Sequence, residues 1–317
     1  MVPFNLKQLC KVTDAGDAVV VEWCQDKSLL ARHMPCDLCG ENCRLYYRAE
    51  QGKPVWRCRK GHDWKKSIIT GTFFENCHLS IGQVLEVLFV VTGGGATISS
   101  VQKIASRETR TLSTQTIVSW TWYFRDTCFR WFDEVQSLPA RPSIGGPGKV
   151  VEVDEAKIGH RKYHRGRMVD GIWILGMVEL QTGAAGDRRR GGHVRMEVCE
   201  DNKRDKAELL KLIKRHVLPG TTIMTDEWKA YSSLPQLGFQ HLTVNHSLYF
   251  VDPATWANTQ TIESTWRSLK RHHAHSGGTR HSGYGLHLCE FMWRREMAIR
   301  GMDPFLGFLE TAAAVYP

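Results

Sequence analysis

Val150-Val151-Glu152-Val153-Asp154 and Thr221-Thr222-Ile223-Met224-Thr225-Asp226 are two runs rich in β-branched residues, and each ends at an aspartate. Such residues favour β-strands, so both carboxylates are expected at strand ends. A third acid, Glu263, lies in Thr259-Gln-Thr-Ile-Glu-Ser-Thr-Trp-Arg-Ser-Leu-Lys270, which has a helical pattern. Two strand-end aspartates and a helical glutamate can converge on a pair of hard divalent cations, an arrangement suited to cutting and joining phosphodiesters.

Other acids fit this role less well. Glu152 and Glu155 flank Asp154, and strand alternation places Glu152 on the face of Asp154, where it can assist. The acids at helix starts, loops and turns are expected to be caps or solvated charges; they are Asp187, Asp201, Asp205 and Asp252. For Asp154, Asp226 and Glu263, the alternative is that each is an ordinary surface acid.

The pattern after residue 148 alternates strands and helices. Strands are expected over Lys149–Asp154, 170–180, 193–199, Thr221–Thr225 and Phe239–Val244, with a helix over Lys206–Val217 and further helices from about Thr259. This β-β-β-α-β-α-β-α order is that of a ribonuclease H-like domain. We therefore expect an α/β fold with that domain over residues 149–317.

Four segments precede this domain. Residues 1–32 predict a short helix or two, residues 33–78 a small zinc-ribbon module, residues 79–138 a helix-turn-helix-like domain, and residues 139–148 a linker rich in proline and glycine. The first long helix has Ser80 as its N-cap and ends at the glycines from Gly93.

A metal site is predicted from cysteine spacing. Cys36 and Cys39 form a CxxC pair, and Cys58 with His62 can complete four zinc ligands, while Cys43 competes as the fourth. The alternative is ordinary thiols. The segment is basic, so we expect it to contact the DNA backbone; its basic residues are Arg44, Arg48, Lys53, Arg57, Arg59 and Lys60.

The helical segment resembles a helix-turn-helix. Gln102–Ala105 is followed by a helix that opens with Ser113, Thr114, Gln115 and Thr116, small polar residues able to reach base edges or phosphates. The alternative is a helix pair that simply packs.

Charge and composition point to a polyanionic partner. The 317 residues carry a net charge of +9, which suits nucleic acid, although solubility alone also explains basic charge. The ten cysteines are unevenly placed in a chain without a signal-peptide pattern, which favours a reducing compartment. No apolar run reaches the ~18–20 residues of a membrane span, so no membrane partner is expected.

The helix of Glu263 has a basic face. Lys270 lies two turns after Glu263 on the same side, and Arg267 and Arg271 widen that surface, so all three are expected to contact DNA phosphates. This face is followed by His272, His273 and His275. Histidines beside DNA do not require a bound metal, so we expect none at these three.

At this point the chain resembles Merlin-type DNA transposases and their bacterial insertion-sequence relatives, which combine a zinc ribbon with a ribonuclease H-like domain. The matching stretches are Val150-Val-Glu-Val-Asp-Glu-Ala-Lys-Ile-Gly159, Pro219-Gly-Thr-Thr-Ile-Met-Thr-Asp-Glu-Trp-Lys-Ala-Tyr231, Val244-Asn-His-Ser247, and Asn258 through Lys270, with Cys58-Arg-Lys and Gly71-Thr-Phe-Phe-Glu upstream. The resemblance covers roughly residues 35–300.

The resemblance implies that Asp154, Asp226 and Glu263 are the family's DDE carboxylates, with 36 residues between the last two. It implies Mg²⁺ or Mn²⁺ at these acids and structural Zn²⁺ at the ribbon, where the family often has cysteine at the position of His62. It further implies cut-and-paste transposition: binding of terminal inverted repeats, cleavage at element ends, and joining of the freed 3′-OH to target DNA.

Two other functions remain open. One is a host-adopted sequence-specific DNA-binding protein, and the other is a structure-specific nuclease without strand transfer. Synapsis of two DNA ends implies a homodimer or higher oligomer. The expected location is the nucleus in a eukaryote and the nucleoid or cytoplasm in a bacterium.

Overall fold

Two compact units make up the chain in the computed structural model: Met1–Val135 with Gly301–Pro317, and Gln136–Arg300. The structure describes residues 3–47, 53–94, 97–106, 111–135, 143–158, 171–181, 190–245, 247–274 and 283–317. Within these residues no helix combines the length and apolar character needed to cross a membrane.

The first unit joins a small sheet to a set of helices. Its antiparallel sheet, in the order β1-β2-β3, is built from β1 (Arg44–Tyr46), β2 (Val55–Arg57) and β3 (Lys65–Ser67). The helices are α1 (Leu6–Thr13), α2 (Asp17–Asp26), α3 (Ile81–Thr92), α4 (Ile98–Ala105), α5 (Thr114–Arg130) and α9 (Pro304–Val315), and a π-helical turn spans Trp131–Val135. The helix pair expected over the first 32 residues is present, and Ser80 caps α3 through a capping box with Gln83.

The C-terminal helix α9 packs in this first unit, whereas the sequence-based boundaries assign residues 149–317 to one domain. Aromatic contacts explain the placement: Phe308 meets Phe124 with ring centroids 4.9 Å apart, and Phe305 meets Phe89 at 5.5 Å. These rings give α9 an apolar face to bury, and this long-range packing leaves no signal in local sequence.

The second unit is an α/β layer structure. Its five-stranded sheet has the order β10-β9-β5-β6-β7, from β5 (Val150–Ile158), β6 (Ile172–Gln181), β7 (Arg190–Val198), β9 (Thr222–Asp226) and β10 (Gln240–Val244). The pairs β5–β6 and β6–β7 are antiparallel, while β9 lies parallel to both β5 and β10. The short parallel pair β4 (Ile144–Gly145) and β8 (Val217–Leu218) lies outside this sheet, with β4 inside the expected linker, whose residues 139–142 lie outside the described residues.

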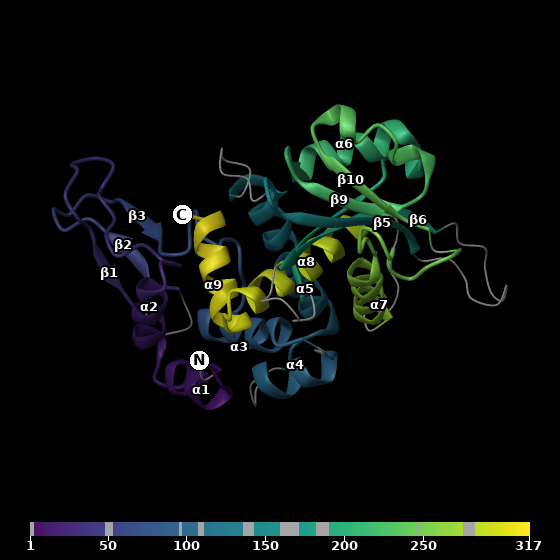
Figure 1. Ribbon diagram of the computed structural model, residues 1–317. Helices are drawn as coiled ribbons and strands as arrows, with labels where there is room; N and C mark the ends of the chain where they lie inside the picture. The colour runs from purple at the N-terminus through teal and green to yellow at the C-terminus, as the bar shows by residue number, and fades with distance from the viewer. Residues whose placement is uncertain are drawn as a thin grey trace. The chain divides into compact units, whose positions relative to one another are not determined.

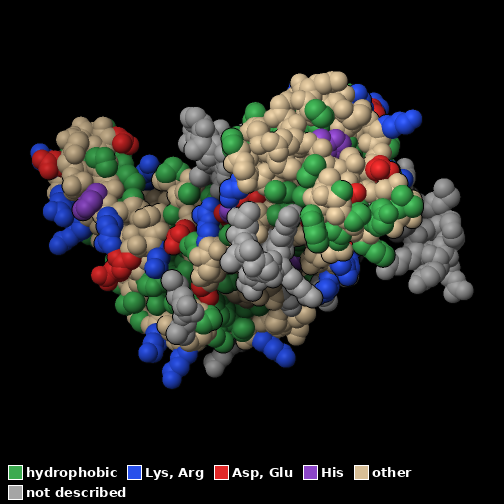
Figure 2. Space-filling view, viewed as in Figure 1, with side chains coloured by type: hydrophobic (Ala, Val, Ile, Leu, Met, Phe, Trp, Pro, Cys, Tyr) green, Lys and Arg blue, Asp and Glu red, His purple; other side chains and the backbone are tan. Residues whose placement is uncertain are grey.

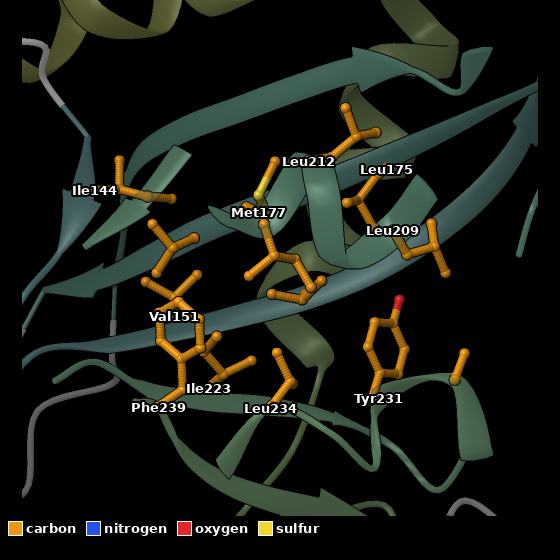
Figure 3. Close-up of a cluster of buried hydrophobic side chains, with 14 of the residues drawn as sticks. Ile144, Val151, Leu175, Met177, Leu209, Leu212, Ile223, Tyr231, Leu234 and Phe239 are labelled. Carbon is orange, nitrogen blue, oxygen red and sulfur yellow. The ribbon is translucent and has the colours of Figure 1, made fainter. Parts of the chain in front are cut away.

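Helices cover both faces of the sheet (Figure 1). On one face lies α6 (Lys206–His216), and on the other lie α7 (Gln260–Ala274) and α8 (Tyr284–Ile299). Figure 3 shows Leu209 and Leu212 of α6 packed toward Val151, Leu175 and Met177 of the strands, and every one of these side chains is at most 1% exposed. This dry core fixes β5 and β9 side by side.

One expected helix is absent from the described residues. The order β-β-β-α-β-α-β-α requires a helix between β9 and β10, but the chain there forms two short 3-10 turns, Lys229–Tyr231 and Pro235–Leu237. Pro235 opens the second turn, and Gly238 closes it in the left-handed region at φ 86°. The proline and the glycine punctuate the segment, which is too short to hold a helix and two connections.

Candidate active site and metal centre

Two aspartates meet because β5 and β9 run parallel as neighbours. The register pairs Val150 with Thr222 and Glu152 with Met224. Two positions further along these strands are Asp154 and Asp226, so their carboxylates lie at the same edge of the sheet. The backbone N–H of Trp228 donates to Asp226 Oδ1 over 3.1 Å, which orients that carboxylate in the turn after β9.

Glu263 lies in the first turn of α7, and its negative charge acts on Asp154. Thr259 Oγ1 donates to Glu263 Oε1 over 3.2 Å. The helix start is held by Glu152, a wholly buried strand residue whose Oε2 accepts the Ile262 N–H over 2.8 Å. Glu152 therefore anchors the helix that carries Glu263 to the strand that carries Asp154, because a carboxylate suits the positive N-terminus of a helix.

A tryptophan joins the same two elements. Trp266 Nε1 donates to Asp154 Oδ2 over 2.9 Å. Its ring lies against Gly176, the β6 residue that pairs with Asp154, and a Cβ added there would lie 2.5 Å from the Trp266 ring. The absence of a side chain at Gly176 is what admits the indole beside the carboxylate.

The pKa of Asp154 reflects its burial and the charges of the two other acids. Burial raises the pKa of Asp154, the Trp266 hydrogen bond opposes this, and the negative charges of Asp226 and Glu263 raise it further. Carboxylates that repel one another favour a bound cation, and carboxylate oxygens are the ligands that Mg²⁺ and Mn²⁺ prefer. Asp154, Asp226 and Glu263 therefore offer oxygen donors of the type that hard divalent cations prefer.

The predicted phosphate-contacting residues share the exposed side of α7. Arg267, Lys270 and Arg271 are exposed, as is Glu263, while the opposite side of the helix is buried through residues such as Trp266 and Leu269. Lys270 lies about 10 Å along the helix axis from Glu263 at the usual rise per residue. This basic face can approach an extended polyanion.

The residues predicted to read DNA bases open α5. Ser113 is the N-cap of that helix and accepts the Thr116 N–H over 3.1 Å. Thr114 and Gln115 are exposed at the helix start, and Thr116 is partly so. Gln102 of α4 donates to the Leu112 carbonyl over 2.8 Å, which ties the two helices across their connection.

Four predicted zinc ligands converge in the first unit. The ligand atoms of Cys36, Cys39, Cys58 and His62 all lie within 4.8 Å of one another. Cys39 Sγ lies 3.6 Å from Cys58 Sγ, and His62 Nδ1 lies 3.4 Å from Cys58 Sγ and 3.9 Å from Cys36 Sγ. These separations match the edges of about 3.8 Å expected for a tetrahedron with Zn–S bonds of about 2.3 Å.

Local structure prepares this cluster for a metal. The two ligand turns pass through Gly40 and Gly61, at φ 71° and 80°, a conformation that favours glycine. Although burial opposes ionisation of the Cys58 thiol, hydrogen bonds from the Lys60 N–H and neighbouring groups lower its pKa to about 7. A thiol that ionises readily suits Zn²⁺. The rival ligand Cys43 is buried beside the cluster but outside the converging set.

Basic side chains surround the small sheet next to this cluster. Figure 2 shows Lys and Arg side chains gathered over the β1–β3 region. The predicted contacts Arg57, Arg59 and Lys60 are exposed, with Arg57 over the Tyr46 ring and Lys60 paired with Glu41 at 3.0 Å. The predicted surface is therefore accessible to a phosphate backbone.

Sequence reasoning missed the groups that hold the carboxylates in place. Trp266 and Tyr231 stand inside the quoted motifs, so helical spacing from Glu263 was an available signal for the first. Arg204 gave no signal. It lies 3.3 Å from Glu155, whose pKa is raised to about 7 by burial, against the opposing effects of the Tyr231 hydroxyl and the Arg204 charge.

Comparisons with known proteins identify a family and a relative that the chain resembles. The family described as ISXO2-like transposase domain matches residues 145–296, which include all three acids. An uncharacterised transposase-like protein of Haemophilus influenzae is 32% identical over 88 residues, which are 28% of this chain and 70% of that protein. No solved structure matches the chain significantly. On these grounds the chain belongs to the ISXO2-like transposases, a family of the insertion-sequence type.

Proposed function

We propose that this transposase performs cut-and-paste DNA transposition and that Asp154, Asp226 and Glu263 are its catalytic carboxylates. One observation carries the proposal: Asp154 and Asp226 end two adjacent parallel strands, and the helix that carries Glu263 is anchored to one of these strands. Such a carboxylate set serves metal-assisted phosphodiester cleavage and has no use in a protein that only binds DNA.

We assign the second unit to the ribonuclease H-like class. Its strand order supports this assignment, because three consecutive antiparallel strands are followed by two strands parallel to the first and on its other side. The motifs quoted from the sequence favour the Merlin-type group within these transposases. The zinc cluster and the α4–α5 helix pair then belong to DNA binding.

Each residue has a chemical role in this scheme. Asp154, Asp226 and Glu263 would hold a pair of Mg²⁺ or Mn²⁺ ions, which when bound would supply activation of the attacking oxygen and neutralisation of charge on the leaving oxygen. Asp154 and Asp226 supply ligand oxygens from the sheet edge, and Glu263 supplies them from α7. Trp266 orients the carboxylate of Asp154 through a hydrogen bond, and Glu152 anchors the N-terminus of α7. Lys270, with Arg267 and Arg271, holds the phosphates of the bound strand.

The DNA partners are terminal inverted repeats and target duplex. Ser113, Thr114, Gln115 and Thr116 at the start of α5 read the repeats, while Arg57, Arg59 and Lys60 contact their backbone. Zn²⁺ at Cys36, Cys39, Cys58 and His62 holds the small sheet together. Two ends must be held at once, so the working form is a homodimer or larger, located where its DNA lies: the nucleus of a eukaryote, or the nucleoid or cytoplasm of a bacterium.

The test is a reconstituted reaction with Mg²⁺, labelled DNA ends taken from the flanks of the reading frame, and a target plasmid. Wild-type protein is expected to give joined products. Nicks without joining would indicate a nuclease, and mobility shifts without cutting would indicate a DNA-binding protein. Asp226→Asn and Glu263→Gln are expected to bind the ends normally and to lose cleavage by at least about 1,000-fold.

A neighbouring acid provides the matched control. Glu227 is exposed beside Asp226, so Glu227→Gln changes net charge by the same amount at the next position. Its cleavage is expected to stay within about threefold of wild type. Normal cleavage by Asp226→Asn would remove the catalytic assignment.

A further inference from the structure

On the face of the sheet opposite Asp154, the guanidinium of Arg204 lies between two indole rings. Its Cζ atom is 4.7 Å from the Trp173 ring centroid and 4.2 Å from that of Trp228. Its NH2 group lies 3.3 Å from Oε2 of Glu155, whose side chain is only 3% exposed. The two ring contacts and the ion pair together fix the position of the Arg204 guanidinium.

The loop that carries Arg204 is itself held in an unusual conformation. Asp201 and Asn202 both have positive φ, at 53° and 56°, a left-handed conformation that aspartate and asparagine adopt more readily than other non-glycine residues. Asn202 also bonds the start of β6: its Oδ1 accepts the Trp173 N–H over 2.7 Å, and its Nδ2 donates to the Gly171 carbonyl over 3.0 Å. The backbone two residues before Arg204 is thus held at the start of β6.

The same cluster holds the turn that follows β9. The ring of Trp228 rests on Arg204, and the N–H of Trp228 bonds Asp226 Oδ1 over 3.1 Å. Three residues later, the hydroxyl of the buried Tyr231 donates to Glu155 Oε1. The turn after Asp226 is therefore attached at two points to Glu155, and Glu155 is the residue that follows Asp154 on β5.

We propose that Arg204, Glu155 and Tyr231 are positioning residues that hold the carboxylate of Asp226 at the distance from Asp154 needed for the two to share a divalent cation. This inference rests on the proposed function, because it assigns the cation to these two acids. None of the three residues touches the substrate in this scheme. They act by joining the strand of Asp154 to the turn of Asp226 from behind the sheet.

Positioning of this kind has a signature that a purely structural role lacks. If the carboxylates move apart, cation affinity falls, and an excess of cation restores the reaction. Loss of groups that orient metal ligands costs about 10- to 100-fold in metal affinity. A structural defect instead lowers the amount of folded protein without changing how the folded fraction responds to cation concentration.

The experiment compares full-length wild type with Tyr231→Phe, which loses one hydroxyl, and Arg204→Met, which loses the charge at similar length. Arg215→Met is the control, since Arg215 of α6 pairs with Glu197 of β7, outside this cluster. Mn²⁺ binding is measured by calorimetry without DNA, and cleavage of labelled ends is measured across Mn²⁺ concentrations. Thermal unfolding is followed in parallel.

Tyr231→Phe and Arg204→Met are expected to raise the Mn²⁺ Kd and the half-saturating Mn²⁺ concentration about 10-fold or more, with cleavage at saturating Mn²⁺ within about threefold of wild type. Unchanged Mn²⁺ affinity in folded Tyr231→Phe overturns the inference, and this variant decides alone if Arg204→Met does not fold. An equal shift in Arg215→Met also overturns it. Failure of the wild type to bind Mn²⁺ or to cut instead overturns the proposed function, which keeps the two failures distinct.

Discussion

The indole of Trp266 bonds the carboxylate of Asp154 across 2.9 Å, and so joins helix α7 to strand β5 at the candidate active site. The contact exists because residue 176, opposite Asp154 on β6, is a glycine that leaves room for the ring. Glu152 makes a second connection at the N-terminus of α7. The position of Glu263 is therefore set by strand residues 87 or more positions earlier in the chain.

The first prediction concerns Gly176. Gly176→Ala places a methyl group where the Trp266 ring now lies, 2.5 Å from its nearest atom, so the ring must move. We expect the free energy of unfolding to fall by about 1–3 kcal/mol, as for other overpacked sites. Cleavage is expected to fall with it, because Asp154 loses its donor. Urea unfolding and the cleavage assay measure the two effects.

A second glycine is the control for this substitution. Gly285 lies in the first turn of α8, and a Cβ there meets no atom within 4 Å. Gly285→Ala is expected to leave stability unchanged or to raise it by up to about 1 kcal/mol, since alanine favours helix. Equal losses in both variants would contradict the role given to the space above Gly176.

Glu152 gives the second prediction, which separates a helix anchor from a metal ligand. Glu152→Gln keeps an acceptor for the Ile262 N–H and loses only the charge, which is worth about 0.3–2 kcal/mol at a helix N-terminus. Glu152→Ala leaves that buried N–H without this partner, at a cost of about 1–3 kcal/mol. We therefore expect alanine to destabilise more than glutamine in urea unfolding. Cleavage by Glu152→Gln should stay within about tenfold of wild type, and its complete loss would show that Glu152 belongs among the ligands.

Much of the second unit, and the metal cluster of the first unit, could be predicted from the sequence because their signals are local. β-branched runs marked β5 and β9, and apolar spacing marked α6. The CxxC pair marked the metal cluster, whose four converging ligands match the predicted set. The acids at strand ends could be placed together because parallel neighbours share an edge.

What could not be predicted depends on contacts between distant segments. The placement of α9 depends on Phe305 and Phe308 meeting rings from residues 73–124. The contacts of Arg204 with Trp173 and Trp228 join three segments that are far apart in the sequence. Local periodicity contains no information about such pairs. The missing helix between β9 and β10 was a different failure, because Pro235 and Gly238 were visible in the sequence as local signals against a helix there.

The third prediction tests the zinc ligands. His62→Ala removes one of four converging ligand atoms, so bound zinc per chain is expected to fall. The β1–β3 module is then expected to unfold at a lower temperature, because metal binding stabilises the folded module. Cys43→Ala is the matched control, because Cys43 is buried beside the cluster but outside the converging set. It should retain zinc. Metal content measured by atomic absorption after dialysis decides, and zinc loss from Cys43→Ala with retention in His62→Ala would reverse the assignment.

The fourth prediction concerns pH and the contact between β7 and α8. His193 Nδ1 lies 2.7 Å from Glu296 Oε2. The hydrogen bond with Glu296 raises the pKa of His193, although burial opposes it. Burial disfavours the Glu296 carboxylate, but His193 and Arg300 outweigh it and lower its pKa to about 2. The pair is therefore fully charged between the ordinary values of 4.5 for Glu and 6.5 for His.

The charged pair of His193 and Glu296 stabilises the fold only while both groups are charged. Its contribution is lost as pH falls from 4.5 toward about 2, because Glu296 becomes protonated. It is also lost as pH rises through the raised pKa of His193, because His193 becomes neutral. His193→Phe should therefore cost about 1 kcal/mol more at pH 5.5 than at pH 9, a modest value because the imidazole is partly exposed and screened. His241 on β10 is the contrast, since burial lowers its pKa and its charging at low pH destabilises the fold. His241→Phe is accordingly expected to cost less at pH 5.5 than at pH 9. Urea unfolding at both pH values measures the four differences, and a His193→Phe cost that does not change with pH would show that the contact contributes no charge-dependent stability.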